Sequence, residues 1–441
     1  MSLYQLGLVE ALTAISNGDF TAADYVNSCL DRMHAVEPQL GAFIHFDEDA
    51  VRQASLLPAD GPMGGMPVGI KDVIATRGVP TEMGSAAFRG HVPEQSAWVV
   101  QALADAGAVM FGKTVSTEFA WRHPGKTRNP WNLSHTPGGS SSGSAAAVAA
   151  GCVPVALGTQ TLGSVVRPAA FCGVVGYKPS YGSIPRSGVY ELAHSLDHVG
   201  ILARHVTDAA FVASLLTAND GLDFPRLPVA APVWPVAKAV KSPRIVVLRT
   251  SMWERSSREQ QDLIERTAQQ LAAAGATLTW LEWPELFNMI WTVAQTLCDA
   301  EGAAVNAHLA HENPPRISQP SLELIARGRA IPVLDYIQAL KDQQMLTQAF
   351  ASYMEPFDAV LTAPAFGEAP LGLDATGDAA FCTPFTLFGA PAISLPTSLS
   401  AKGLPLGIQL ASPWGHDRTL LETALWVEAQ LAWGNRFPIE A

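Results

Sequence analysis

The chain has little cysteine and no pairing pattern for it. Its five cysteines are odd in number and widely spaced, and no CxxC occurs. This usage argues against a disulfide framework and favours reduced core cysteines in a cytoplasmic protein. No apolar run approaches the ~18 residues of a membrane span. The N-terminus lacks the basic start and unbroken apolar stretch of a signal peptide. We therefore expect a cytoplasmic protein with no membrane partner.

Basic residues are also scarce. The chain has 28 Lys and Arg against 40 Asp and Glu, a formal net charge of -12. Such a balance disfavours a nucleic acid held by a basic face. Hydrophobic residues make up 48% and charged residues 15%, which is typical of a large globular protein with a filled core. The composition thus predicts no nucleic-acid partner.

Helix-like and strand-like patterns alternate along the chain. Short apolar runs such as 66–70 and 244–248 predict buried strands, whereas 95–106 predicts a helix. This alternation predicts an α/β protein with a largely buried sheet. The segment 285–355 is mostly helical in pattern. No internal repeat is visible, so we expect one domain that covers the whole chain.

Within that domain, residues 220–355 predict a more variable, cap-like region on one side of the sheet. Its first part, 220–243, is rich in proline and predicts a surface connection. We expect the substrate pocket to be built from 285–355, from Trp121–Arg128 and from residues around Phe381–Phe388.

The segment Gly107–Thr114 matches the phosphate-loop pattern GxxxxGK[ST]. A phosphate loop follows a strand and keeps its own residues polar or glycine-rich. Here a predicted helix precedes Gly107 and the four middle residues are apolar. The pattern favours a helix, a cap and a strand over a nucleotide site.

A second pattern, GxSxG at Gly139–Gly143, matches the nucleophile elbow of α/β-hydrolases. An elbow needs a hydrophobic strand directly before it. The residues that stand there, 132–138, are polar and rich in proline and glycine and predict a loop. No acid and histidine follow at telling positions, so this match is also misleading.

The informative stretch runs from Pro137 to Pro179. It holds a Gly/Ser turn at 138–143 that leads into an apolar helix, and a second turn at 158–163 that ends at Ser164. Two such turns beside one strand bring hydroxyls and free backbone N–H groups together. Acyl transfer needs this combination of a nucleophile and an oxyanion hole.

These segments resemble the amidase signature family. GGSSSGSAAAVAAG and GTQTLGSVVRPAAFCGVVGYKPS match its signature, and GIKD at 69–72 resembles its catalytic-lysine segment. Similar stretches, including His194–Ala210, extend the resemblance from about residue 20 to 433. Within the family, the serine-rich segment and GTQT look most like malonamidase-type bacterial amidases. The resemblance implies a large mixed, mostly buried β-sheet covered by helices on both sides. It also suggests a homodimer.

The resemblance assigns roles residue by residue. Ser164 matches the acylated serine, Ser140 the relay serine that sits in a cis peptide, and Lys71 the base. The remaining matched positions form an oxyanion loop and its support: Thr161, Leu162, Gly163 and Ser164 with their backbone N–H groups, and Thr159 and Gln160 behind them. The chain departs from the family at Leu162, where a glycine is usual. This leucine is either strained or narrows the acyl pocket.

The chemistry of the three residues is consistent. Free lysine has a pKa near ~10.4, but Lys71 ends an apolar strand, and burial would favour its neutral form. A neutral amine accepts a proton from Ser140, which accepts one from Ser164. No metal and no cofactor is required, and no metal-ligand cluster is visible in the sequence.

Arg167, three residues after Ser164, leaves two alternatives open. It binds a substrate carboxylate, as malonamidase-type enzymes suggest, or it is a buried arginine that braces the loop.

Three functions compete. The first is a metal-independent hydrolase that opens a linear amide of a small molecule and releases ammonia or an amine. The second is an A-type component of a tRNA-dependent amidotransferase. The third is a binding protein or pseudoenzyme, which the complete set of Lys71, Ser140 and Ser164 disfavours.

Overall fold

The computed structural model describes residues 2–57, 60–222, 242–312, 314–434 and 436–439. The predicted surface connection at 220–243 falls mostly on residues outside this set. The proposed division into one domain with a cap-like region stays a prediction.

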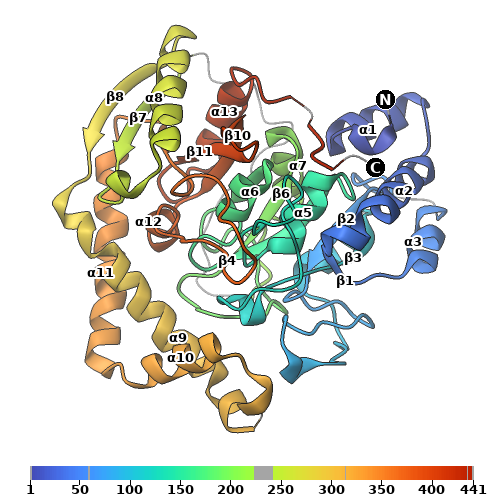
Figure 1. Ribbon diagram of the computed structural model, residues 1–441, viewed down its shortest axis with the longest axis horizontal. Helices are drawn as coiled ribbons and strands as arrows, with labels where there is room; N and C mark the ends of the chain where they lie inside the picture. Colours follow the sequence, from blue (N-terminus) through green and yellow to red (C-terminus); the bar gives the residue numbers. More distant parts are fainter. Residues whose placement is uncertain (1, 58–59, 223–241, 313, 435, 440–441) are drawn as a thin grey trace.

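One mixed sheet of 11 strands runs through the molecule (Figure 1). Its strand order is β1-β3-β2-β4-β6-β5-β10-β11-β9-β7-β8. The strands are β1 (Phe43–His45), β2 (Pro67–Lys71), β3 (Val109–Thr114), β4 (Val155–Gln160), β5 (Val175–Lys178), β6 (His198–Ala203), β7 (Arg244–Arg249), β8 (Thr277–Glu282), β9 (Ala359–Thr362), β10 (Ala392–Leu399) and β11 (Pro405–Ala411). The central strands are buried along their whole length, which is why their sequences are nearly continuous apolar runs.

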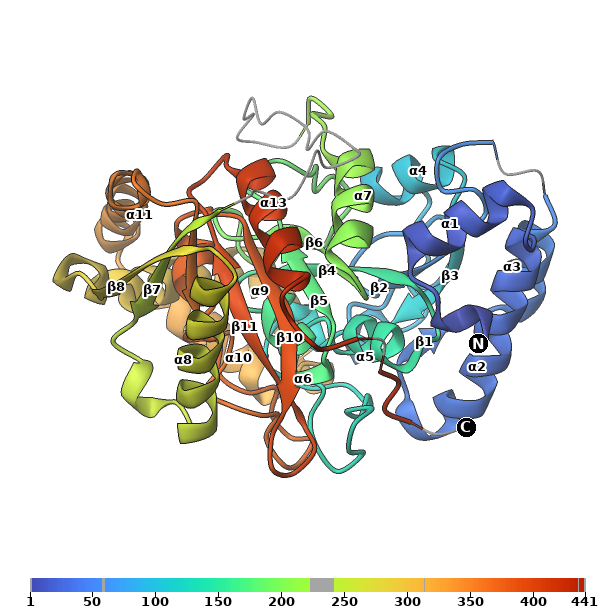
Figure 2. The ribbon, with the colours of Figure 1, turned by 90° about the horizontal axis from the view of Figure 1, so that it is seen from above.

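Helices cover the sheet on both faces, with α7 and α13 on one side and α5 and α6 on the other (Figure 2). The α-helices are α1 (Leu8–Asn17), α2 (Ala22–Leu40), α3 (Glu48–Ser55), α4 (Trp98–Asp105), α5 (Ser142–Ala150), α6 (Val166–Cys172), α7 (Val206–Leu216), α8 (Arg258–Ala273), α9 (Ile290–Glu312), α10 (Gln319–Arg329), α11 (Val333–Met354), α12 (Thr383–Leu387) and α13 (Asp417–Glu428). The predicted α/β class, with a mostly buried mixed sheet covered on both sides, is confirmed.

Helix α5 explains the alanine-rich part of the signature segment. Every residue of Ser142–Ala150 is buried, so only small side chains fit between this helix and its neighbours. A Cβ on Gly143 would lie 2.2 Å from the carbonyl oxygen of Ala42 and 2.3 Å from the nitrogen of Val115. The N-terminus of α5 is therefore pressed against the backbone that follows β3.

The false phosphate loop is a helix cap followed by a strand. Helix α4 ends at Asp105, Gly107 has a φ of 82°, and β3 begins at Val109. The Lys113 and Thr114 side chains of the pattern are buried in the sheet. Burial there leaves no phosphate-binding loop.

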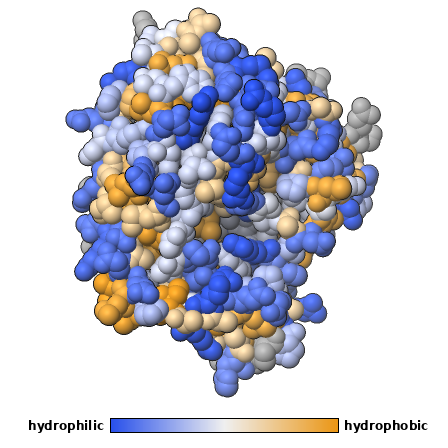
Figure 3. Space-filling view, turned by 60° about the vertical axis from the view of Figure 1, so that its left-hand side comes forward, coloured by the Kyte–Doolittle hydropathy of each residue, from blue (hydrophilic) through white to orange (hydrophobic). Residues whose placement is uncertain are grey.

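The face that carries α11 is largely hydrophilic with separate apolar patches (Figure 3). Val333 and Leu334 at the start of α11 are 68% and 74% exposed. Among the described residues, no helix is long and apolar enough to span a membrane. The five cysteines are all free and buried.

Candidate active site

The candidate residues lie where three parallel strands end. β2 runs parallel to β3 and to β4, with Ile70 paired to Lys113 and to Leu157. Lys71 is the last residue of β2, so it lies beside the end of β4 and the turn that follows it. The carboxyl ends of parallel strands are a common place for active sites.

Lys71 and Ser140 are in contact. Lys71 Nζ lies 2.7 Å from Ser140 Oγ and 2.7 Å from Thr159 Oγ1. Lys71 is 0% exposed, Ser140 1% and Thr159 6%. Thr159 thus contacts the lysine directly, in the supporting position that the sequence predicts.

Burial sets the protonation of Lys71. It lowers the pKa of the lysine well below its ordinary value, against the charge of Asp197, which raises it. No carboxylate oxygen lies within ion-pair distance of Lys71 among the described residues. The lysine is therefore suited to act as a neutral base at Ser140.

The two serines lie on adjoining segments. The Gly139–Ser140 peptide bond is cis, as the resemblance implies. The next residue, Ser141, donates its backbone N–H to the carbonyl oxygen of Ser164 at 3.3 Å. Ser164 is 7% exposed and lines a cavity that Lys71 and Ser140 do not reach. The acylated serine of the family would thus meet substrate while its relay stays buried.

The loop from Thr161 to Ser164 offers unused donors. Within the part of the chain that the structure describes, the backbone N–H groups of Leu162, Gly163 and Ser164 donate to no protein acceptor. Gln160 Oε1 accepts the N–H groups that follow, from Val165 and Val166 at 2.9 and 3.0 Å. Gln160 therefore supports the loop from behind and leaves the preceding N–H groups for an oxyanion.

Leu162 adopts no left-handed conformation. The positive-φ residues other than glycine in the described chain are Met83, Phe119 and Ala120. The Leu162 side chain is half-buried and lines the cavity beside Ser164. Of the two alternatives for this departure, the geometry supports a narrowed pocket.

Arg167 holds the backbone of the serine turn. It is 6% exposed, and its Nη2 donates to the Gly139 carbonyl oxygen at 2.7 Å and to Thr376 Oγ1 at 3.2 Å. One face of the residue also reaches the cavity. These contacts favour the bracing role over carboxylate binding.

Two buried carboxylates contact the site and were not singled out from the sequence. Thr161 Oγ1 donates to Asp197 Oδ1 at 2.5 Å. Glu118 accepts Ser85 Oγ at 2.9 Å and Ser321 Oγ at 2.7 Å. The motif His194–Ala210 contains Asp197, so a signal was present, but only the fold shows which residue it serves.

The cavity over Ser164 has a volume of about 590 Å³. Each of the three predicted segments contributes wall residues, and the stretch 374–380 adds a wall that was not predicted. The charged side chains at the cavity are Arg122, Arg167, Glu323, Asp374 and Asp378. Apolar walls come from Leu162, Trp121 and Trp291. The cavity thus combines an apolar throat with groups of both charges.

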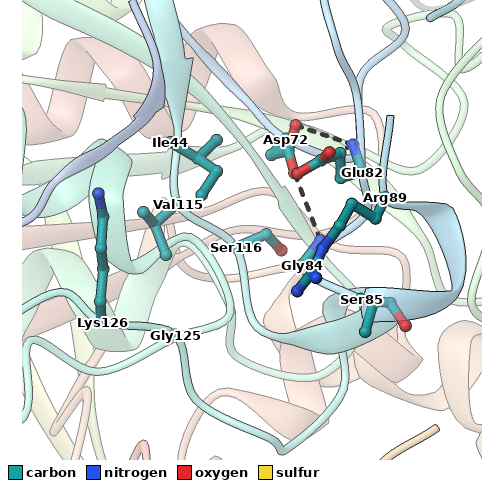
Figure 4. A pocket seen from close by; sticks show the side chains of 11 residues that line it. Ile44, Asp72, Glu82, Gly84, Ser85, Arg89, Val115, Ser116, Gly125 and Lys126 are labelled. Atoms are coloured by element: carbon teal, nitrogen blue, oxygen red, sulfur yellow. Dashed lines mark hydrogen bonds between the residues drawn. The ribbon is translucent and has the colours of Figure 1, made fainter. Parts of the chain in front are cut away.

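A second cavity, of about 250 Å³, lies beside the residue after Lys71 (Figure 4). There the Asp72 carboxylate accepts the N–H groups of Glu82 and Gly84 at 3.2 and 3.3 Å. Burial raises the pKa of Asp72 to about 6. None of the predicted catalytic residues lines this cavity, and Asp72 serves to fix the turn after β2.

The described residues contain no cluster of three or more His, Cys, Asp and Glu side chains placed to hold a metal ion.

The chain belongs to the amidase family, whose model matches residues 24–421. Its sequence is 32% identical to the A-type component of glutamyl-tRNA(Gln) amidotransferase from an Exiguobacterium species, over 96% of this chain and 97% of that protein. The members of this family act on carbon–nitrogen bonds, so the chain has the fold and the site of an amidase-type enzyme. A malonamidase-type subclass stays a prediction.

Solved structures agree with this assignment. The structure of 6-aminohexanoate cyclic dimer hydrolase with substrate matches with a TM-score of 0.90 at 26% identity, over 99% of both chains. The A-type component of glutamyl-tRNA(Gln) amidotransferase from Thermotoga maritima matches with a TM-score of 0.82 at 27% identity, over 96% of this chain and 94% of that one.

The partners predicted from the sequence were wrong. A small-molecule amide, no nucleic acid and a homodimer were expected, yet relatives across nearly the whole chain are named subunits of an enzyme for glutamyl-tRNA(Gln). The error has a physical cause. Net charge describes one chain, and it does not report on nucleic acid that other subunits of an assembly contact.

Proposed function

We propose that this chain is the amide-opening component of a tRNA-dependent amidotransferase, and that it releases ammonia from the side-chain amide of glutamine. The observation that carries the proposal is the cavity over Ser164, which offers groups of both charges above a reactive serine. The curated relatives support the assembly part of the proposal, because three amidotransferase components are 29–34% identical to this chain over nearly their full length.

The reaction follows from the contacts of the three residues. Lys71 takes the Ser140 proton while Ser140 takes the Ser164 proton, and Ser164 Oγ attacks the amide carbon. The oxyanion is held by the free N–H groups of the 161–164 loop. Return of the proton along the same path to nitrogen releases ammonia and leaves an acyl-serine. Water then repeats the path and frees the acid.

The cavity suits the α-amino acid end of glutamine. Arg122 lines it with a guanidinium that stacks on Trp121 at 4.8 Å and provides N–H donors for a carboxylate. Asp374 and Asp378 lie on the same cavity and provide acceptors for an ammonium group. The apolar throat at Leu162 would pass the methylene chain, which places the side-chain amide at Ser164.

The test uses ammonia release from L-glutamine and from two analogues. Glutaramate lacks the α-amino group, and 4-aminobutanamide lacks the α-carboxylate. We expect glutamine to be the best of the three and Ser164→Ala to release no ammonia from any. Arg122→Gln should raise KM about tenfold for glutamine and glutaramate, because a charge-assisted bond is lost. The same variant should leave 4-aminobutanamide unchanged.

The outcome is decisive in either direction. Ammonia transfer to glutamyl-tRNA(Gln) when the companion subunits are added would establish the assembly. Absence of glutamine turnover, with turnover of another amide by the same preparation, would overturn glutamine as the donor.

A second function is favoured by a specific observation. Leu162 and two tryptophans give the throat more apolar surface than glutamine requires. The structure with the TM-score of 0.90 is named as a hydrolase of a cyclic amide dimer. Hydrolysis of an apolar linear or cyclic amide is therefore the alternative, and the same panel extended with such amides separates the two.

A further inference from the structure

Strand pairing brings Thr161 and Asp197 together. β4 ends at Gln160, which lies opposite His198, the first residue of the antiparallel strand β6. Because the two strands run in opposite directions, the residue after Gln160 faces the residue before His198. The Thr161 hydroxyl accordingly donates to Asp197 Oδ1 at 2.5 Å.

The Asp197 carboxylate is fixed on its other side as well. Its Oδ2 accepts the backbone N–H groups of Leu192 at 2.7 Å and Ala193 at 3.0 Å. The residue is 8% exposed. An ionised carboxylate only accepts hydrogen bonds, and here three donors converge on it. Asp197 is thus a rigid anchor for whatever its first oxygen holds.

We propose that Asp197 is a positioning residue of the amide-opening reaction, which fixes the entry of the 161–164 loop through Thr161 and acts by its charge on the base Lys71. The inference rests on the proposed function, because the loop matters only when an oxyanion forms beside Ser164. It extends that function by assigning a role to a side chain that touches neither substrate nor nucleophile.

The loop has separate ties along its length, and Asp197 makes the one at its entry. The other ties bind carbonyl groups: Thr386 Oγ1 to Leu162 O at 3.0 Å, Arg167 N to Gly163 O at 2.9 Å and Ser141 N to Ser164 O at 3.3 Å. An oxyanion hole works when its donors are fixed before charge develops. Loss of the first tie would let the peptide planes that carry those donors rotate.

Charge is the second part of the role. Burial raises the pKa of Asp197 to about 6, so the group is ionised at neutral pH. A negative charge near Lys71 favours the ammonium form and raises the pKa of that lysine, against burial, which lowers it. The other titratable groups that face Asp197 are Arg186, whose Nη1 donates to its carbonyl oxygen at 3.1 Å, the buried His198 and the Cys298 thiol.

Three variants separate the two parts. Thr161→Val removes the tie and keeps the charge, whereas Thr161→Ser restores the hydroxyl. Asp197→Asn removes the charge and keeps the shape, since its amide can donate to the Thr161 hydroxyl. Asp31→Asn, an exposed position on α2, is the matched control for loss of one negative charge. Each enzyme is compared by kcat, KM and the pH dependence of kcat/KM for the amide that the wild type opens best.

We expect Thr161→Val to lower kcat about 100-fold, the size of effect seen when one oxyanion donor is lost, with KM within about threefold of wild type. Thr161→Ser should regain most of that loss. The rate rises with pH as Lys71 becomes neutral. Asp197→Asn should therefore lower kcat and also move this limb to lower pH, whereas Thr161→Val leaves it in place.

Unchanged kcat in both Thr161→Val and Asp197→Asn would overturn the positioning role. An unmoved pH limb in Asp197→Asn, or an equal shift in Asp31→Asn, would overturn the effect on Lys71. If the wild type opens no amide, the proposed function fails by itself. Crystal structures of wild type and Thr161→Val then decide the inference, because an undisplaced 161–164 loop in the variant contradicts it.

Discussion

The amine of Lys71 and the hydroxyl of Ser140 lie 2.7 Å apart in a region closed to solvent, although the two residues are 69 positions apart along the chain. Two strands and a tight turn bring them together, since β2 ends at the lysine and the serine precedes helix α5. Because neither side chain reaches the cavity, the pair can act on substrate only through Ser164.

The pH dependence of turnover should report the lowered pKa of Lys71. The base works when neutral, so kcat/KM rises with pH through that pKa. Since burial holds the pKa well below 10.5, we expect a plateau well before pH 10. Lys71→Arg stays charged at every working pH and should lose about 1000-fold. Lys126→Arg, at an exposed lysine, is the control. A limb centred near pH 10 in the wild type would contradict the assignment.

Arg167 should matter for stability more than for substrate charge. Arg167→Met leaves the Gly139 carbonyl oxygen without its donor inside the protein. We expect a loss of about 2–4 kcal/mol in the free energy of unfolding, measured by urea denaturation. Arg258→Met, with a side chain 76% exposed, should change it by less than about 0.5 kcal/mol. A stable Arg167→Met enzyme with raised KM for carboxylated amides alone would restore the carboxylate-binding role.

Leu162 should select for narrow substrates. Replacement by glycine opens the cavity wall beside Ser164. The ratio of kcat/KM for an aryl amide to that for a small aliphatic amide should rise about tenfold, the effect expected for one or two methylene groups in a pocket. Leu162→Ala should give an intermediate ratio. The ratio, rather than either rate, is the readout, because added backbone freedom lowers both rates. A constant ratio across the series would refute the narrowing.

Glu118 should tie the cavity wall to helix α10. It is 3% exposed and accepts hydrogen bonds from serines on two separate segments, including Ser318 N at 3.0 Å and Ser321 Oγ at 2.7 Å. Glu118→Gln places an amide donor against these donors and should cost about 1–3 kcal/mol. Hydrogen exchange of α10 should quicken in this variant. The exposed Glu323→Gln on the same helix should leave exchange unaltered, and equal effects of both variants would argue against the tie.

Local signals in the sequence carried the catalytic trio and the fold class. The turn before Ser140, the apolar strand that ends at Lys71 and the turn that ends at Ser164 are short segments whose order is itself diagnostic. Their contacts were therefore predictable from matched positions. The same patterns correctly excluded a phosphate loop at 107–114, since four apolar residues cannot form one.

Long-range pairing was beyond the reach of these patterns. Asp197 serves Thr161 only because β6 pairs antiparallel to β4, and no local periodicity specifies a partner strand. The wall at 374–380 reaches the cavity through tertiary packing in the same way. Composition also failed for partners, because the charge of one chain does not describe an assembly.

The most direct test of the account is covalent labelling of the nucleophile. The protein is treated with a fluorophosphonate, which reacts with activated serines, and the modified peptide is found by mass spectrometry. We predict one adduct, on Ser164, which is absent in Ser164→Ala and strongly slowed in Lys71→Arg and Ser140→Ala. An adduct on another serine, or full labelling of Ser164→Ala, would contradict the assignment of Ser164 as the nucleophile.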